Sequence, residues 1–166
     1  MALEIERRFL VVSDDWKLLA REPQLLRQAY LTTDQEAFIV RIRILGDEAA
    51  WLTVKLFAEG FSSHEFEYEI PMEDAEQLWR LCPHRIRKTR FALDHAGEQR
   101  WVVDCFEDAN FPLVLAEVEL PGETAPLTIP PWCGRELTGD TRWSNVSLAI
   151  RAMNDYSNSH LYNDLI

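Results

Sequence analysis

Apolar and charged residues alternate with a period of two along most of this chain. The alternation is clearest in eight segments: LEIERRFLVV (3–12), LLRQAYLTT (25–33), FIVRIRIL (38–45), WLTVKLF (51–57), HEFEYEI (64–70), RKTRFAL (87–93), WVVDCF (101–106) and LAEVEL (115–120). Successive side chains of a β-strand point to opposite faces, so this period predicts eight strands. Residues 46–48 (GDE) and 95–98 (HAGE) are typical of the turns that join hairpin strands.

Three short helices are predicted between the strands. The first follows Ser13, which would cap the acidic first turn of DDWKLLARE (14–22). The second covers about 73–81 and the third starts near Ser144. Their apolar stripes are Leu78, Trp79 and Cys82 in the second helix, and Val146, Ile150 and Met153 in the third. Many strands with few helices predict an α+β, mainly β fold, as an antiparallel sheet or a closed barrel.

Length and composition predict a single domain and disfavour membrane and disulfide-rich proteins. The 166 residues fit one domain, 1–153, followed by a polar tail, 154–166. No apolar run approaches the roughly 18 residues that span a membrane, and the charged N-terminus does not resemble a signal peptide. Three widely spaced cysteines, Cys82, Cys105 and Cys133, form neither a disulfide framework nor a metal motif. We therefore expect a cytoplasmic protein without a membrane partner.

Net charge and the apolar strand faces indicate which partners to expect. The chain carries 28 acidic and 17 basic residues, a net charge of −11, which disfavours nucleic acid. The outer apolar faces of the predicted strands exceed what three short helices would cover, and this favours a homodimer.

Five of the predicted strands carry two like charges at a spacing of two residues, on one face. The pairs are Glu4 and Glu6, Arg41 and Arg43, Glu67 and Glu69, Lys88 and Arg90, and Glu117 and Glu119. An ordinary sheet that exposes its polar face to water is one interpretation. Adjacent like charges cost energy, however, so segregation by sign favours faces that converge on a ligand carrying both charges.

A polyphosphate with its divalent cations is such a ligand. Carboxylate oxygens are ligands of Mg²⁺ and Mn²⁺, and Arg and Lys match phosphate oxygens. In a barrel with a polar lumen, seven acids would face seven bases. The predicted inward set is Glu4, Glu6, Glu67, Glu69, Asp104, Glu117 and Glu119, with Arg8, Arg41, Arg43, Lys55, Lys88, Arg90 and Arg142.

The same residues carry a family resemblance. EIERRF (4–9) resembles the ExExK signature of the CYTH superfamily, the triphosphate tunnel metalloenzymes, and the similarity continues in the family's order to about residue 152. It is strongest to the short bacterial inorganic triphosphatases. The resemblance implies a closed tunnel of eight antiparallel strands that hydrolyses the terminal phosphate of tripolyphosphate with Mg²⁺ or Mn²⁺. Class IV adenylyl cyclase, thiamine triphosphatase and a non-catalytic polyphosphate-binding module are the alternatives on this fold.

The resemblance also implies roles for individual residues. The metal-side carboxylates are Glu4, Glu6, Glu117 and Glu119, with Asp104 as a helper. The triphosphate clamps are Arg8, Arg41, Arg43, Lys55, Lys88, Arg90 and Arg142. Tyr30 and Lys88 match a water-activating pair. Glu67 and Glu69 would contact the binding residues and hold them in place without touching the ligand. The sequence departs from the family pattern at Arg8, where the signature has Lys, and at Ser144, where related members tend to have Lys.

Overall fold

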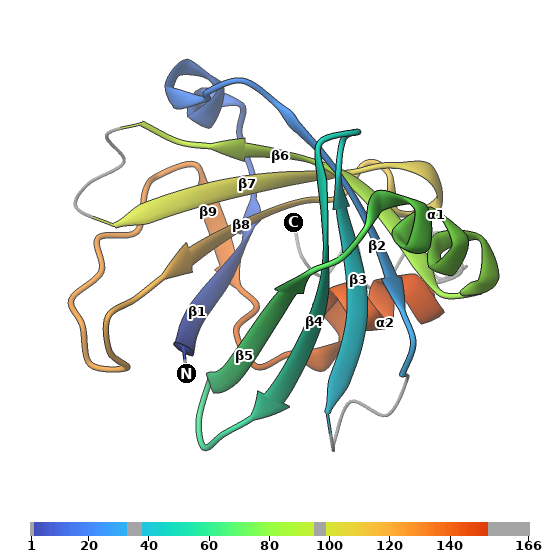
Figure 1. The fold of residues 1–166 in the computed structure, drawn as a ribbon. Helices are drawn as coiled ribbons and strands as arrows, with labels where there is room; N and C mark the ends of the chain where they lie inside the picture. Colours follow the sequence, from blue (N-terminus) through green and yellow to red (C-terminus); the bar gives the residue numbers. More distant parts are fainter. Residues whose placement is uncertain (1, 33–37, 95–98, 153–166) are drawn as a thin grey trace.

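The computed structural model describes residues 2–32, 38–94 and 99–152 (Figure 1). The strands are β1 (Ala2–Val11), β2 (Gln24–Tyr30), β3 (Ile39–Leu45), β4 (Ala49–Phe57), β5 (Ser62–Glu69), β6 (Arg85–Ala92), β7 (Arg100–Phe106), β8 (Val114–Glu119) and β9 (Cys133–Glu136). The α-helices are α1 (Met72–Leu81) and α2 (Asn145–Ile150), and short 3-10 helices are η1 (Asp15–Leu19), η2 (Asp108–Asn110) and η3 (Thr141–Trp143).

Eight of these strands form a closed antiparallel barrel. Their order is β5-β4-β3-β2-β6-β7-β8-β1, and the first residues of β1 pair back with β5 to close the ring. The strand β9 adds to the other end of β1, at Phe9 and Val11, so β1 pairs with three strands. The predicted closed eight-stranded barrel, mainly β with flanking helices, is therefore confirmed.

The outer faces of the strands are apolar, and two separate clusters of buried side chains cover them. Helix α1 covers part of this surface, where Trp79 packs with Ile42 and Ile44. On the other side, η1 and the segment after β8 cover β1, β7 and β8, and there Trp101 and Trp132 meet edge to face at 5.4 Å. Burial of these large apolar side chains holds the outside of the barrel and leaves its inner face for polar residues.

Helix α2 fills one end of the lumen. It packs against the inner side of β6 and β2 (Figure 1), where Val146 and Leu148 join Ile86, Tyr30 and Leu115 in one buried cluster. The lumen therefore has an apolar, filled end and a charged remainder. The charged inward residues lie above this floor.

The eight predicted strands, the turn at 46–48 and the helix near 73–81 are confirmed. The segment after Ser13 forms only the five-residue 3-10 helix η1, with Asp14 rather than Ser13 at its N-cap. In α2, Leu148 is buried and Ile150 is 40% exposed, so the predicted stripe was wrong there. The turn at 95–98, Met153 and the tail 154–166 lie outside the described residues. None of the described helices is long and apolar enough to cross a membrane.

Candidate active site

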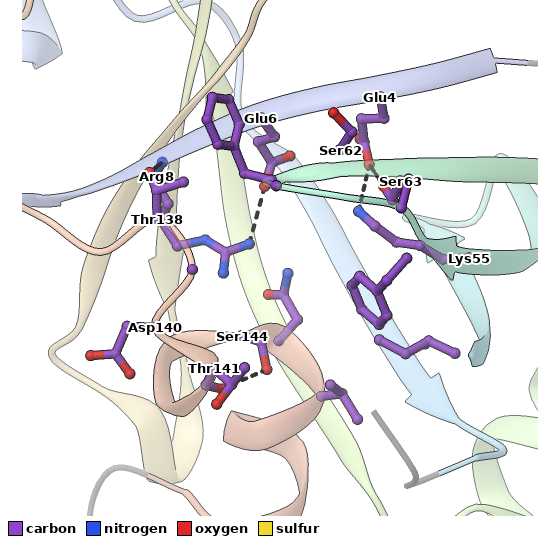
Figure 2. Close-up of a pocket in the computed structure, with 18 of the residues that line it drawn as sticks. Glu4, Glu6, Arg8, Lys55, Ser62, Ser63, Thr138, Asp140, Thr141 and Ser144 are labelled. Carbon is purple, nitrogen blue, oxygen red and sulfur yellow. Dashed lines mark hydrogen bonds and ion pairs between the residues drawn. The ribbon is translucent and has the colours of Figure 1, made fainter. Parts of the chain in front are cut away.

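A cavity of about 360 Å³ lies between β1, the β4–β5 hairpin and the segment that contains η3 and α2 (Figure 2). Strand alternation turns the odd or even positions of β1, β2, β3 and β4 toward it. The predicted site residues in its lining are Glu4, Glu6, Arg8, Tyr30, Arg41 and Lys55. Two carboxylates and three cations therefore share one cavity.

Glu4 and Lys55 form an ion pair in the cavity wall. The Lys55 ammonium lies 2.5 Å from Glu4 Oε2, and the Ser63 hydroxyl donates to the same oxygen at 3.4 Å. Burial opposes ionisation of Glu4, but the Lys55 ammonium and the Arg41 guanidinium together outweigh burial and lower the pKa of the carboxyl. Glu4 is thus ionised and held in place at neutral pH.

Arg8 connects three acceptors with its planar guanidinium. Its Nη2 donates to Glu6 Oε1 at 3.1 Å and to Glu117 Oε1 at 3.0 Å, and its Nη1 donates to the Trp143 carbonyl at 3.2 Å. Burial and the nearby Glu117 carboxylate raise the pKa of Glu6 to about 7. Burial opposes the ionisation of Glu117 as well. Its cationic neighbours, first among them Arg8, outweigh burial and lower the pKa of this carboxyl.

The buried pair of Lys88 and Asp104 continues this network deeper in the wall. Lys88 Nζ lies 2.5 Å from Asp104 Oδ2, and both side chains are fully buried. Arg90 donates to both Asp104 oxygens, at 2.7 and 2.8 Å, and to Glu117 at 2.9 Å. Burial lowers the pKa of Lys88. Burial opposes the ionisation of Asp104, but Arg90 and Lys88 outweigh it and lower that pKa.

Tyr30 is buried beneath the cavity, and its hydroxyl donates to Gln28 Oε1 at 2.9 Å. Burial raises the pKa of this phenol. Arg41 lies beside it and reaches Glu65 at 3.7 Å, while its Nε is buried with no hydrogen-bond partner among the described residues. Arg41 therefore has an N–H donor that the protein itself leaves unused.

Several predicted site residues are not brought to this cavity. Arg43 pairs with Glu67 and lies over the Trp51 ring, and both Glu69 and Glu119 are exposed. Arg142 is about half exposed and binds Asp140 through two nitrogens, at 2.9 and 2.7 Å. Within the described part of the chain, the cavity lining includes none of Arg43, Lys88, Arg90, Arg142, Asp104, Glu117, Glu119, Glu67 and Glu69.

The sequence interpretation missed the inward-facing residue Glu65. It precedes Glu67 by two positions, so the alternation of β5 already placed it on the inner face, where it lies 3.6 Å from Lys55. Thr138, Asp140 and Asn145 also line the cavity. These three belong to a segment without strand alternation, so only the closed tertiary structure brings them there.

The carboxylates fit a hard divalent cation. No group of three His, Cys, Asp or Glu side chains converges as a complete metal site in residues 2–32, 38–94 and 99–152. Mg²⁺ in phosphate-binding sites takes only one or two carboxylates, and water and phosphate oxygens complete its shell. Glu4 and Glu6 meet this need from one strand face. The raised pKa of Glu6, caused first by burial, marks a carboxylate that additional positive charge would stabilise.

Comparisons with known proteins agree with this geometry. The family model described as the CYTH domain matches residues 2–152. An inorganic triphosphatase of Acetivibrio thermocellus is 41% identical over 95% of this chain and 98% of its own length. One of Nitrosomonas europaea is 37% identical over 89% and 97%. A crystal structure of an inorganic triphosphatase superposes with a TM-score of 0.66 and 35% identity, covering 90% of this chain and 96% of that one.

Proposed function

Because the chain belongs to the CYTH domain family, we propose that it is an inorganic triphosphatase, a hydrolase of phosphoanhydride bonds. One observation carries the proposal: Arg8, Arg41 and Lys55 share a cavity with Glu4 and Glu6. A ligand that suits this lining combines several anionic oxygens with a divalent cation. Tripolyphosphate with Mg²⁺ or Mn²⁺ has this composition.

The cations of the cavity bind the triphosphate. Arg41 offers its unused Nε–H, and Arg8 and Lys55 supply positive charge from the neighbouring walls. Arg43, Lys88 and Arg90 extend this positive charge along the inner face, where each is paired with a carboxylate. Arg142 is the weakest clamp of the predicted set, because its guanidinium is already bound to Asp140.

Glu4 and Glu6, which line the cavity, are the first residues that would hold Mg²⁺ or Mn²⁺, and the predicted Glu117 and Glu119 lie beside them on the neighbouring strand β8. When bound, such a cation neutralises phosphate charge and polarises the water that attacks. The protein prepares two of these carboxylates itself: Lys55 fixes Glu4, and Arg8 with Arg90 fixes Glu117. Asp104 does not reach the cavity and acts by holding Lys88 and Arg90 in place.

In the reaction, a water oxygen bonds to the terminal phosphorus and the bond from that phosphorus to the bridging oxygen breaks. The products are pyrophosphate, which keeps the bridging oxygen, and orthophosphate, and one water proton is released. Lys88 is the candidate to receive it: without ligand it is an ammonium paired with Asp104, and burial lowers its pKa, which favours the neutral amine that a proton acceptor needs. Tyr30 stays protonated, since burial raises its pKa, and it orients Arg41.

The apolar part of the lining favours a second candidate, an organic triphosphate such as thiamine triphosphate or a nucleoside triphosphate. Ile39, Phe57, Phe61 and Val146 also line the cavity. A thiamine or adenine ring would bury apolar area there. Class IV adenylyl cyclase activity would use the same wall but release cyclic AMP and pyrophosphate.

One panel of assays tests these assignments. Purified protein is incubated with tripolyphosphate, ATP or thiamine triphosphate, with Mg²⁺, Mn²⁺ or EDTA, and phosphate, pyrophosphate and cyclic AMP are measured. We expect metal-dependent phosphate release, fastest from tripolyphosphate. Binding without turnover would identify a polyphosphate-binding module and contradict the proposal.

Two expectations lie outside the assay. The three cysteines are free, consistent with the expected cytoplasmic location. The homodimer stays a prediction that light scattering would test.

A further inference from the structure

Asn145, the first residue of α2, lies between the buried ammonium of Lys88 and the cavity. Lys88 Nζ donates to Asn145 Oδ1 at 3.1 Å and to Asp104 Oδ2 at 2.5 Å. Lys88 itself is fully buried, whereas Asn145 belongs to the cavity lining. The amide of Asn145 therefore connects the buried cation to the space that the ligand occupies.

The chemistry of Lys88 fixes which end of the amide faces it. An ammonium can only donate hydrogen bonds, so it selects the carbonyl oxygen of Asn145. The amide nitrogen Nδ2 is bonded to the same carbon and points away from Lys88, with two N–H donors. Asn145 thus offers the cavity a neutral donor, next to the cationic donor Arg8.

The backbone of α2 is well anchored, so this donor has a defined place. The Ser144 hydroxyl accepts from the Ser147 amide at 3.2 Å and begins the helix. The buried Asn110 side chain donates to the Leu148 carbonyl at 3.2 Å and holds the other end. Leu148 is packed in the apolar floor of the lumen. A fixed donor contributes more to binding than a mobile one, because less side-chain entropy is lost.

We propose that Asn145 is a substrate-binding residue that donates from Nδ2 to a phosphate oxygen of the triphosphate and at the same time positions Lys88 through Oδ1. This inference rests on the proposed triphosphate ligand. It assigns two roles to one amide: a direct contact with the ligand and a fixed acceptor for the buried ammonium.

The test separates these two roles with isosteric changes. Asn145→Asp keeps an oxygen for Lys88 and removes both N–H donors, whereas Asn145→Ala removes both ends. Isothermal titration calorimetry with tripolyphosphate in EDTA measures the Kd without turnover. We expect both variants to raise the Kd about tenfold or more, the usual effect of losing a hydrogen bond to a charged group. Only Asn145→Ala should lower the Tm, since it leaves Lys88 short of an acceptor.

A matched variant controls for the added negative charge of Asn145→Asp. Ser144→Asp puts a carboxylate at the neighbouring position of the lining and preserves the helix cap. We expect Ser144→Asp to raise the Kd clearly less than Asn145→Asp. Equal effects of the two, or a wild-type Kd in Asn145→Ala, would overturn the inference. Turnover by the wild-type protein is scored separately, so absence of hydrolysis with an altered Kd would contradict the proposed function alone.

Discussion

Lys88 and Asp104 meet at 2.5 Å inside the barrel wall, and both side chains are completely shielded from water. Such a pair contributes little as a whole, because removing two charges from water costs about as much as their attraction returns. Its loss on one side only is costly, since a charge then remains buried without its partner. The pair therefore makes the polar wall sensitive to single substitutions.

Asp104→Asn should lower the free energy of unfolding by about 3–5 kcal/mol, because it leaves the Lys88 ammonium and part of the Arg90 guanidinium uncompensated. Urea unfolding measures this change. The partly exposed pair of Asp140 and Arg142 supplies the control, and Asp140→Asn should cost about 1 kcal/mol or less. In the double variant with Lys88→Met, most of the loss should be recovered; simple additivity of the two single effects would contradict the pairing.

Glu6→Gln should stabilise the metal-free protein at pH 8 more than at pH 5.5. Burial, with Glu117, raises the pKa of Glu6 from 4.5 to about 7. A carboxyl whose pKa is raised on folding stabilises the folded state fully below pH 4.5, and this contribution is lost as the pH rises through 7. The Gln side chain stays neutral, so the Tm difference from wild type grows with pH.

Tripolyphosphate without metal should raise the Tm. A hundredfold excess over Kd adds about 2.7 kcal/mol of stability. For a protein of this size that corresponds to a Tm rise of roughly 5–10 °C. Arg41→Ala should reduce the shift strongly, because Arg41 lines the cavity with an unused donor. Arg43→Ala should reduce it less, since Arg43 is paired with Glu67 away from the lining. A Tm unchanged by millimolar tripolyphosphate would contradict a ligand-binding lumen.

Arg8→Lys restores the residue type of the family signature but should lower the free energy of unfolding of this protein. The guanidinium bonds Glu6, Glu117 and the Trp143 carbonyl at once, and a single ammonium cannot reach all three in the same geometry. We expect a loss of about 2 kcal/mol, the order of one hydrogen bond to a charged group, visible as a lower Tm. Arg7→Lys, in the neighbouring surface pair with Glu136, is the control and should change little.

Strand alternation predicted the eight strands and the inward face of each, because a period of two depends only on local geometry. It therefore placed Glu4, Glu6 and Arg8 on one face correctly. Alternation could not predict which strands lie side by side, and so it could not predict which side chains form ion pairs. Lys55 contacts Glu4 because β1 pairs with β5, and these two strands are far apart in sequence. The lining from η3 and α2, including Asn145, has no strand alternation, and its place at the cavity follows only from the packing of α2 into the end of the lumen.

The position of β1 in the ring has a consequence for biosynthesis. This strand, with three residues of the cavity, is synthesised before the other strands of the barrel, and its partner β8 lies 109 residues later, as measured from Arg8 to Glu117. At about 5–20 residues per second, the nascent strand waits roughly 5–20 seconds for that neighbour. Charged side chains along an unpaired strand edge disfavour pairing with other chains. Glu4, Glu6 and Arg8, which line the cavity of the folded protein, would therefore also oppose such pairing in the nascent chain.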